Sequence, residues 1–280
     1  VVVLSLLSAL SWGSGDFAGG LVSRRAPVAG VLLGSQLAGG VVAVVLAVVL
    51  AEPLPRAPDV AWALISSCAG GIGIASLYTG LSRGRMGVVA PMAGVLVAAI
   101  PAVVGIAIQG QLPTPVLAGI GLAMVSVLVV SRVGAADDGR PSGIGWGLVA
   151  GLGLGIVAVT LSRFGPGEVF GPLAIMRFGE AALIAVIVTA RRSAIPARVE
   201  SRLLPVVAGV GALDMLGTGA YIAATQAGPL AVAGVLSALY PVTTVVLAIT
   251  ILREPLARWH LVGILVAFAS IVLITTGSMA

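Results

Sequence analysis

The sequence predicts an all-α integral membrane protein in which ten transmembrane helices form two five-helix repeats of inverted topology. Composition, recurring apolar runs and a likeness between the two halves lead to this prediction. Hydrophobic residues make up 59% of the chain and charged residues only 9%, and the mean hydropathy is +1.18. These values lie far outside the range of soluble globular domains. The expected environment of the chain is therefore a lipid bilayer.

Apolar runs of about twenty residues recur along the chain between short polar breaks, and each can cross a hydrocarbon core of about 30 Å as a helix. The breaks are rich in Gly, Pro and Arg, as in EPLPRAPD at 52–59 and RRSAIPARVESR at 191–202, which is typical of loops. The predicted spans are residues 2–22, 29–50, 60–82, 87–108, 114–133, 143–163, 169–190, 204–226, 229–251 and 259–277.

The arginines predict how the helices are oriented. All fifteen basic residues are Arg, and they are dispersed over the loops, whereas a nucleic-acid-binding face would need them clustered. The loops after odd-numbered spans hold twelve of them and the alternate loops hold two, Arg56 and Arg163. Because positive charge stays on the cytoplasmic side, the odd-numbered loops are predicted to be cytoplasmic and both termini to lie outside. The predicted location is the plasma or inner membrane of the cell.

The second half of the chain reads as a loose copy of the first. The stretch 76–99 aligns with 219–242, which places Tyr78 over Tyr221 and, without a gap, Gln111 over Glu254. The predicted division is a first repeat at 1–133, an inter-repeat loop at 134–142 and a second repeat at 143–280. Five spans in each half give the repeats opposite orientations, a recurrent architecture of transporters with the substrate site near the midplane.

Three stretches resemble the drug/metabolite transporter superfamily, of the ten-helix type with two EamA domains. LSALSWGSGDFAGG (7–20) is similar to its early Trp-Gly, and LAIMRFGEAALI (173–184) to its Arg-Phe in a second helix. The stretch 234–274 resembles a pattern of a Pro, an acidic residue thirteen positions on and a Gly-bearing helix, here Pro241, Glu254 and Gly263. Departures are Gln111 in place of an acidic residue, and a predicted outside location of the termini where members often have cytoplasmic ones.

The resemblance implies a carrier of small organic molecules, commonly an exporter of amino acids, metabolites or drugs. It also implies a cavity lined mainly by helices one, three, four, six, eight and nine, with the second helices outside it and the fifth helices peripheral. Alternating access would move the two repeats around this cavity. No nucleotide-binding motif is present in the sequence, so the energy would come from a substrate or proton gradient.

Ionisable and aromatic residues inside the spans are the candidates for the cavity. Asp16 and Asp214 stand at depths where an ionisable side chain normally faces the bundle interior or water. Asp16 could accept a substrate amine or carry a coupling proton, or it could be solvated from the cytoplasmic side or pair with Arg24. Asp214 could exchange a proton, or it could pair with Arg177. Aromatic rings line cavities or anchor helix ends, and prolines free helical carbonyls or simply kink a helix. The predicted cavity residues are Trp12, Asp16, Tyr78, Pro91, Asp214, Tyr221 and Tyr240.

Arg177 and Glu180 are three positions apart on one predicted helix and can touch. Arg177 lies too near the middle of its span to reach the interface, so a counter-ion is expected beside it. Because Arg177 aligns with Gln36 of the second span, and the resemblance implies that second helices lie outside the main cavity, we predict a structural ion pair, extended to Asp214, and not the main substrate site. Pro241 and Glu254 are predicted to fix repeat geometry or coupling.

A membrane-embedded aspartyl protease is the rival hypothesis, since GSGD at 13–16 spells Gly-x-Gly-Asp and Asp214 could supply a second carboxylate. The Tyr-Asp and Pro-Ala-Leu that accompany that motif are missing from the sequence. The lone Cys68 and the lone His260 predict no metal site, and no cofactor is expected. We therefore predict a non-enzymatic carrier, a structural membrane protein being a further alternative, with monomer or homodimer left open.

Overall fold

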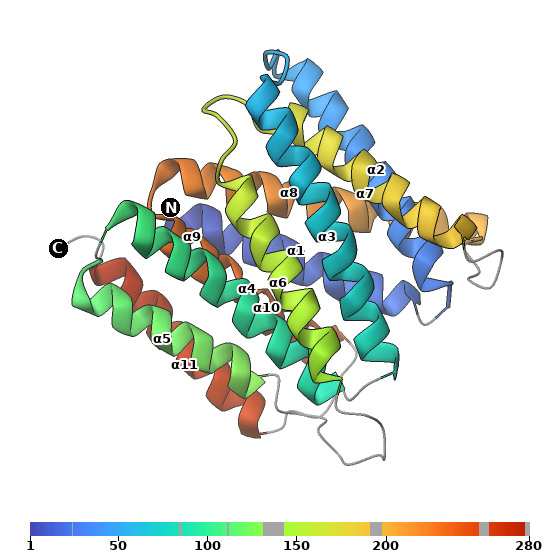
Figure 1. The fold of residues 1–280 in the computed structure, drawn as a ribbon. Coiled ribbons are helices and arrows are strands. Elements are labelled where there is room, and N and C mark those ends of the chain that lie inside the picture. Colours follow the sequence, from blue (N-terminus) through green and yellow to red (C-terminus); the bar gives the residue numbers. More distant parts are fainter. Residues whose placement is uncertain are drawn as a thin grey trace.

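The computed structural model describes residues 1–23, 25–83, 86–110, 112–130, 143–190, 198–251 and 258–277, and no strand occurs among them (Figure 1). The predicted inter-repeat loop 134–142 and Glu254 lie outside these residues. The α-helices are α1 (Val2–Ser23), α2 (Val28–Val49), α3 (Ala57–Arg83), α4 (Met86–Gln109), α5 (Thr114–Val130), α6 (Ile144–Leu161), α7 (Phe170–Ala190), α8 (Leu204–Ala227), α9 (Leu230–Ser237), α10 (Tyr240–Ile251) and α11 (Arg258–Gly277).

Helix boundaries fall where the sequence supplies prolines and glycines. Pro27 and Pro229 precede α2 and α9 with extended backbone angles, because a proline has no N–H to donate and its ring blocks continuation of a preceding helix. Gly143 precedes α6 at a φ of 74°, a left-handed conformation that glycine adopts without strain. Every predicted span coincides with a helix, which confirms the all-α class, except that residues 229–251 form two helices.

The break between α9 and α10 falls at Ala238 and Leu239, and Pro241 is the second residue of α10. Without an N–H, Pro241 cannot bond to the carbonyl of Ser237, and the backbone makes tighter turns there. The Leu239 N–H donates to the Leu236 carbonyl at 3.2 Å and the Val242 N–H donates to the Leu239 carbonyl at 2.9 Å. In contrast, α4 continues as one helix through Pro91 and Pro101.

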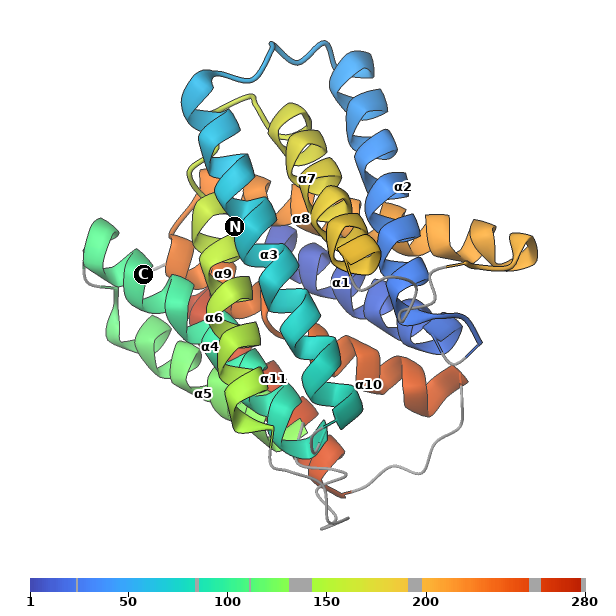
Figure 2. The same cartoon turned by 45° about the vertical axis from the view of Figure 1, so that its right-hand side comes forward.

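The helices of the first half pack on those of the second. The main pairs are α5 with α11, α3 with α6, α4 with α6, α1 with α8, and α2 with α7. Figures 1 and 2 show α5 and α11 side by side at the edge of the bundle. Glycines allow close approach, as where a Cβ on Gly153 would stand 2.6 Å from the Ala69 carbonyl oxygen of α3.

Several helices have the length and apolarity of membrane spans. Among the described residues these are Val28–Val49, Ala57–Leu77, Ile144–Leu161, Phe170–Ala190 and Ser201–Ala227, and shorter apolar helices occur at Ala93–Gln109, Thr114–Val129 and Leu261–Ile274. Large apolar side chains such as Val48, Val103 and Phe268 point outward, each more than 60% exposed. Such a surface suits lipid, because exposed apolar area of this extent is unfavourable in water.

Candidate functional site

A cavity of about 190 Å³ lies in the middle of the bundle, between helices of both halves. Its wall is formed by α1, α2, α3, α4, α6, α7, α8, α9 and the first residue of α10. The helices α5 and α11 contribute none of the described lining residues, in line with their expected peripheral place. The polar and aromatic side chains of the wall are Trp12, Asp16, Ser35, Gln36, Arg177, Glu180, Asp214, Thr218, Tyr221 and Tyr240.

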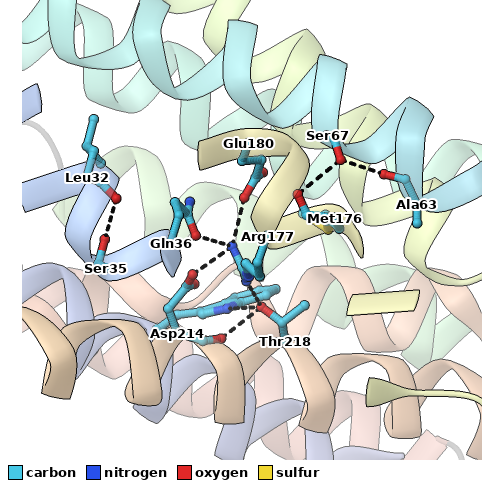
Figure 3. Close-up of polar contacts among 11 residues, drawn as sticks. Leu32, Ser35, Gln36, Ala63, Ser67, Met176, Arg177, Glu180, Asp214 and Thr218 are labelled. Atoms are coloured by element: carbon cyan, nitrogen blue, oxygen red, sulfur yellow. Dashed lines mark hydrogen bonds and ion pairs between the residues drawn. The ribbon is translucent and has the colours of Figure 1, made fainter. Parts of the chain in front are cut away.

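Arg177 stands at the centre of a buried polar network on the cavity wall (Figure 3). Its Nη1 donates to Gln36 Oε1 and Glu180 Oε2, each at 3.1 Å, and lies 2.8 Å from Asp214 Oδ2. The Arg177 and Glu180 side chains are only 5% and 4% exposed. A charge at such burial needs opposite charges and hydrogen bonds to offset its lost hydration. The network therefore ties α2 and α8 to α7.

Thr218 connects the arginine to the first helix. Its Oγ1 accepts from Arg177 Nη2 at 2.6 Å and from Trp12 Nε1 at 3.2 Å, and donates to the Asp214 carbonyl at 2.8 Å. One hydroxyl has one proton and two lone pairs. Its hydrogen-bonding capacity is thus fully used, and the Trp12 indole is held in a fixed orientation against α8.

Two glycines make room for these side chains. A Cβ on Gly70 of α3 would collide with Glu180 Oε1, and a Cβ on Gly217 of α8 would lie 2.6 Å from Trp12 Cδ1. Both distances are shorter than those that real Cβ atoms show to neighbouring atoms. Any larger residue at either position would therefore push the carboxylate or the indole away. These two glycines therefore set the positions of side chains in the cavity wall, in addition to letting the helices pack closely.

Asp16 differs from the other acidic residues of the wall. It is exposed, lines the cavity, and makes no hydrogen bond or ion pair with the described residues. Asp214, with 34% of its side chain exposed, places one oxygen on Arg177. The formal charge of the described lining is −2, from Asp16, Glu180 and Asp214 against Arg177. The cavity thus combines a neutralised arginine with an open carboxylate.

Aromatic rings form one side of the cavity. The Trp12 ring centroid lies 5.6 Å from that of Tyr221, and 6.4 Å from that of Tyr240 in an edge-to-face arrangement of 89°. Such spacings are those of attractive aromatic pairs. The Tyr221 hydroxyl donates to the Ala158 carbonyl at 2.8 Å, and its side chain is fully buried. Trp12 and Tyr240 are only partly buried, so these two rings have surface left for a ligand.

One end of the molecule, which we name the closed end, carries the loops 50–56 and 162–169. Arg56 Nε lies 2.8 Å from Glu168 Oε1 and 3.0 Å from Asp59 Oδ2, while Asp59 Oδ1 accepts from the Gly165 N–H at 2.8 Å. Glu52 accepts from the first N–H groups of α7, at 2.8 Å from Phe170 N, which satisfies donors that a helix start leaves open. We name Glu52, Arg56, Asp59 and Glu168 the closed-end network; it joins the two halves of the chain.

The cavity extends away from the closed end. Toward that end its lining stops at Leu161 and Tyr221, both 1% exposed, and the buried Phe164 lies beyond them. In the other direction the lining continues to Gly19 near the end of α1 and Val31 near the start of α2. The exposed Asp16 lies on this side. The cavity is therefore sealed at the closed end and approached from the end where α1 meets α2.

The structure brings most of the predicted cavity residues together. Trp12, Asp16, Asp214, Tyr221 and Tyr240 all line the same cavity. Tyr78 lies in α3, Pro91 in α4 and Pro241 in α10, but their side chains are not among those described. The roles of these residues stay predictions.

The second helices differ from the expectation. Gln36 of α2 and Arg177 and Glu180 of α7 line the cavity, because α2 and α7 pack on each other and reach across to α8 and α3. The ion pair of Arg177 with Glu180, and its extension to Asp214, are present as predicted. Gln36 and Thr218 were not predicted to line it; the alignment of Gln36 with Arg177 was the available signal for the first.

Comparison with known proteins places the second half of the chain in a family. Residues 141–276 match the EamA-like transporter family. A crystal structure of another protein shares the fold at a TM-score of 0.80 and 18% sequence identity, covering 98% of this chain and 96% of that chain. A comparison with curated protein sequences finds no match. Residues 141–276 are thus similar to the EamA-like transporter family, and several helices of the chain have the length and apolarity of membrane spans, as expected of a multi-pass membrane protein.

Proposed function

We propose that the protein is a secondary carrier that moves a small organic molecule out of the cell by alternating access. The observation that carries the proposal is the central cavity, which lies between the two halves of the chain and presents an open carboxylate, Asp16, in a chain similar to the EamA-like transporter family. Buried cavities with a few convergent polar groups at the interface of two packed units are the usual form of a small-molecule site.

The pattern of helix packing supports two inverted repeats, 1–133 and 143–280, which together form ten spans. In this symmetry α1, α2, α3 and α5 correspond to α6, α7, α8 and α11, and α4 corresponds to α9 and α10 together. Exchanging each helix for its counterpart converts the contact of α1 with α8 into that of α6 with α3. The same exchange converts α2 with α8 into α7 with α3, and α4 with α6 into the contacts of α1 with α9 and α10. The pairs α2 with α7 and α5 with α11 map onto themselves. A pseudo-twofold axis of this kind gives two equivalent arrangements, open to either side.

The distribution of arginines assigns a side to the opening. The cavity extends toward the loop between α1 and α2, one of the odd-numbered loops that hold twelve of the fifteen arginines. The arginine-rich side is cytoplasmic under the positive-inside rule, so the structure is open to the cytoplasm and closed outside. A cytoplasm-facing site in a plasma or inner membrane is the loading state of an exporter.

The rival protease hypothesis uses the same two carboxylates, which do line one cavity. Asp214, however, places an oxygen 2.8 Å from Arg177, whereas an aspartyl protease needs two carboxyl groups that share one proton. The arginine and the EamA domain both favour the carrier.

We predict that Asp214→Asn lowers the transport rate about tenfold or more and flattens its response to a proton gradient. The carboxylate interacts electrostatically with Asp16 across the cavity and pairs with Arg177, so its removal changes the charge balance of the site. The measurement is initial transport rate in proteoliposomes at several internal and external pH values. Glu200→Gln, at an exposed carboxylate paired with Arg202 outside the cavity, is the matched control. Unchanged rate and unchanged pH response in Asp214→Asn would remove this residue from the site.

A screen of cells with and without the protein tests the proposed direction. Expression is expected to raise resistance to, or excretion of, at least one toxic small organic molecule, and Asp214→Asn is expected to abolish the effect at equal protein level. Increased uptake of the same compound would contradict the proposed direction of transport but would still support a carrier function.

A further inference from the structure

We infer that the cavity binds a small organic cation: a protonated amine on a body about the size of one aromatic ring, with a neutral oxygen acceptor close to the amine. This inference rests on the proposed function and names the chemical class of its substrate. It follows from the size of the cavity, the charges on its wall and the hydrogen-bonding groups left open there.

The charges of the wall favour a cation over an anion. Arg177 is its one described basic group, and that guanidinium already contacts Glu180, Asp214, Gln36 and Thr218. An anionic ligand would have to displace these partners and would face three carboxylates. Asp16, by contrast, has no ion-pair partner among the described residues and is exposed to the cavity. A ligand ammonium group would supply the missing counter-charge.

The aromatic side chains place the apolar part of the ligand. Trp12 and Asp16 are four positions apart on α1 and so lie on the same face of the helix. An amine paired with Asp16 therefore has the indole beside it, where a cation and an apolar ring both find favourable contacts. The edge-to-face contact with Tyr240 and the hydrogen bond to Thr218 hold the indole in place.

The volume sets the size of the ligand. A buried apolar cavity of about 150 Å³ holds one benzene molecule. The cavity here measures about 190 Å³. It therefore fits one ring with a short polar head, and excludes fused multi-ring compounds without a change in the wall.

A buried N–H group without an acceptor is the reason for expecting a neutral oxygen in the ligand. The Arg177 Nε–H lies just behind the cavity wall, with almost no accessible surface and no hydrogen-bond partner among the described residues, although the other nitrogens of the guanidinium are bonded. Leaving a buried donor unsatisfied is costly. Once the guanidinium turns slightly toward the cavity, a ligand hydroxyl or carbonyl oxygen would satisfy this N–H, whereas a ligand carboxylate would be repelled by Asp214 and Glu180 beside the guanidinium.

Four compounds with one common body test both features. Phenylalaninol carries an ammonium and a hydroxyl; 3-phenyl-1,2-propanediol replaces the ammonium by a hydroxyl; phenylalanine replaces the alcohol by a carboxylate; and 3-phenyllactate carries both changes. Binding to the purified full chain is measured by titration calorimetry. We expect phenylalaninol to bind about tenfold or more tightly than each of the other three.

Asp16→Asn is expected to bind phenylalaninol about tenfold or more weakly, and to lose far less affinity for the diol, which carries no charge. Continued binding of the diol shows that the variant retains a folded site. Asp16→Glu is expected to restore the preference for the cation, and Glu200→Gln, which removes an exposed carboxylate outside the cavity, to bind like the native chain.

The inference is overturned if any of the three other compounds equals phenylalaninol, if phenylalaninol does not bind at millimolar concentration, or if Asp16→Asn keeps the preference for the cation. Transport separates this failure from failure of the proposed function. If other solutes are exchanged but phenylalaninol does not bind, the protein is a carrier whose substrates belong to another chemical class. If phenylalaninol binds but no solute is exchanged, the inferred binding site stands and the proposed carrier function is refuted.

Discussion

Arg177→Gln is expected to reduce the amount of folded protein far more than the turnover of each folded molecule. The change removes the only described cation of the cavity wall and leaves Glu180, 4% exposed, without its counter-charge. Breaking a buried ion pair by removing one partner costs about 3–5 kcal/mol, a large part of a typical folding free energy of about 5–15 kcal/mol. The contacts that join α7 to α2 and α8 through the guanidinium are lost as well. The measurements are the yield and melting temperature of the purified chain, with transport normalised to folded protein.

Two further variants isolate the buried charge as the cause. Arg177→Gln combined with Glu180→Gln leaves no unpaired glutamate and is expected to recover part of the lost stability. Arg202→Gln removes an arginine that is 77% exposed in a surface ion pair, and is expected to change stability little. A normal yield of Arg177→Gln together with a loss of turnover would show that the arginine serves mainly to bind the substrate and not to hold the fold.

Glu168→Gln is expected to open the closed end. Glu168 is 4% exposed, and its carboxylate holds both the Nε and the backbone N–H of Arg56, across the junction of the two halves. Losing a charged hydrogen-bond acceptor at such a site shifts the balance between closed and open forms by about tenfold or more. Asp59→Asn, which also weakens the bond to the Gly165 N–H, is expected to add to the shift.

A buried cysteine reports this opening. In a Cys68→Ala background, which removes the exposed native thiol, Ala224→Cys places a thiol at a fully buried position of α8 near the closed end. Its reaction with a membrane-impermeant maleimide is expected to accelerate about tenfold in Glu168→Gln. Ala267→Cys, 3% exposed in α11, is the control for general loosening of the bundle. Equal acceleration at both positions, or none at Ala224→Cys, would contradict a gate at the closed end.

The helices could be predicted from the sequence because hydropathy and length are local properties. Runs of about twenty apolar residues bounded by Gly, Pro and Arg gave all ten segments, and Pro241 marked the break that splits one of them. The division into inverted repeats and the orientation in the membrane stay predictions. They depend on the symmetry between the two halves and on the position of the bilayer, and neither is a property of a single segment.

The candidate site could be predicted only in part, because its members meet through packing. The intramembrane charges singled out Asp16, Asp214 and Arg177, which the cavity then joins. Thr218 gave no signal, since one hydroxyl among many becomes important only when it meets both Arg177 and Trp12. The closed-end network was equally hidden: Arg56 and Glu168 are ordinary loop residues until the fold brings the two loops together.

Counterflow in proteoliposomes tests the carrier most directly. Vesicles containing the purified chain are loaded with an unlabelled compound, diluted, and given a trace of the same compound in labelled form; the panel includes amines, amino alcohols, amino acids and other small metabolites. A carrier predicts transient accumulation of label above equilibrium for at least one compound, at a rate that falls in Asp214→Asn and is unchanged in Glu200→Gln. Absence of counterflow across the panel, from protein that is folded by melting temperature, would contradict the account.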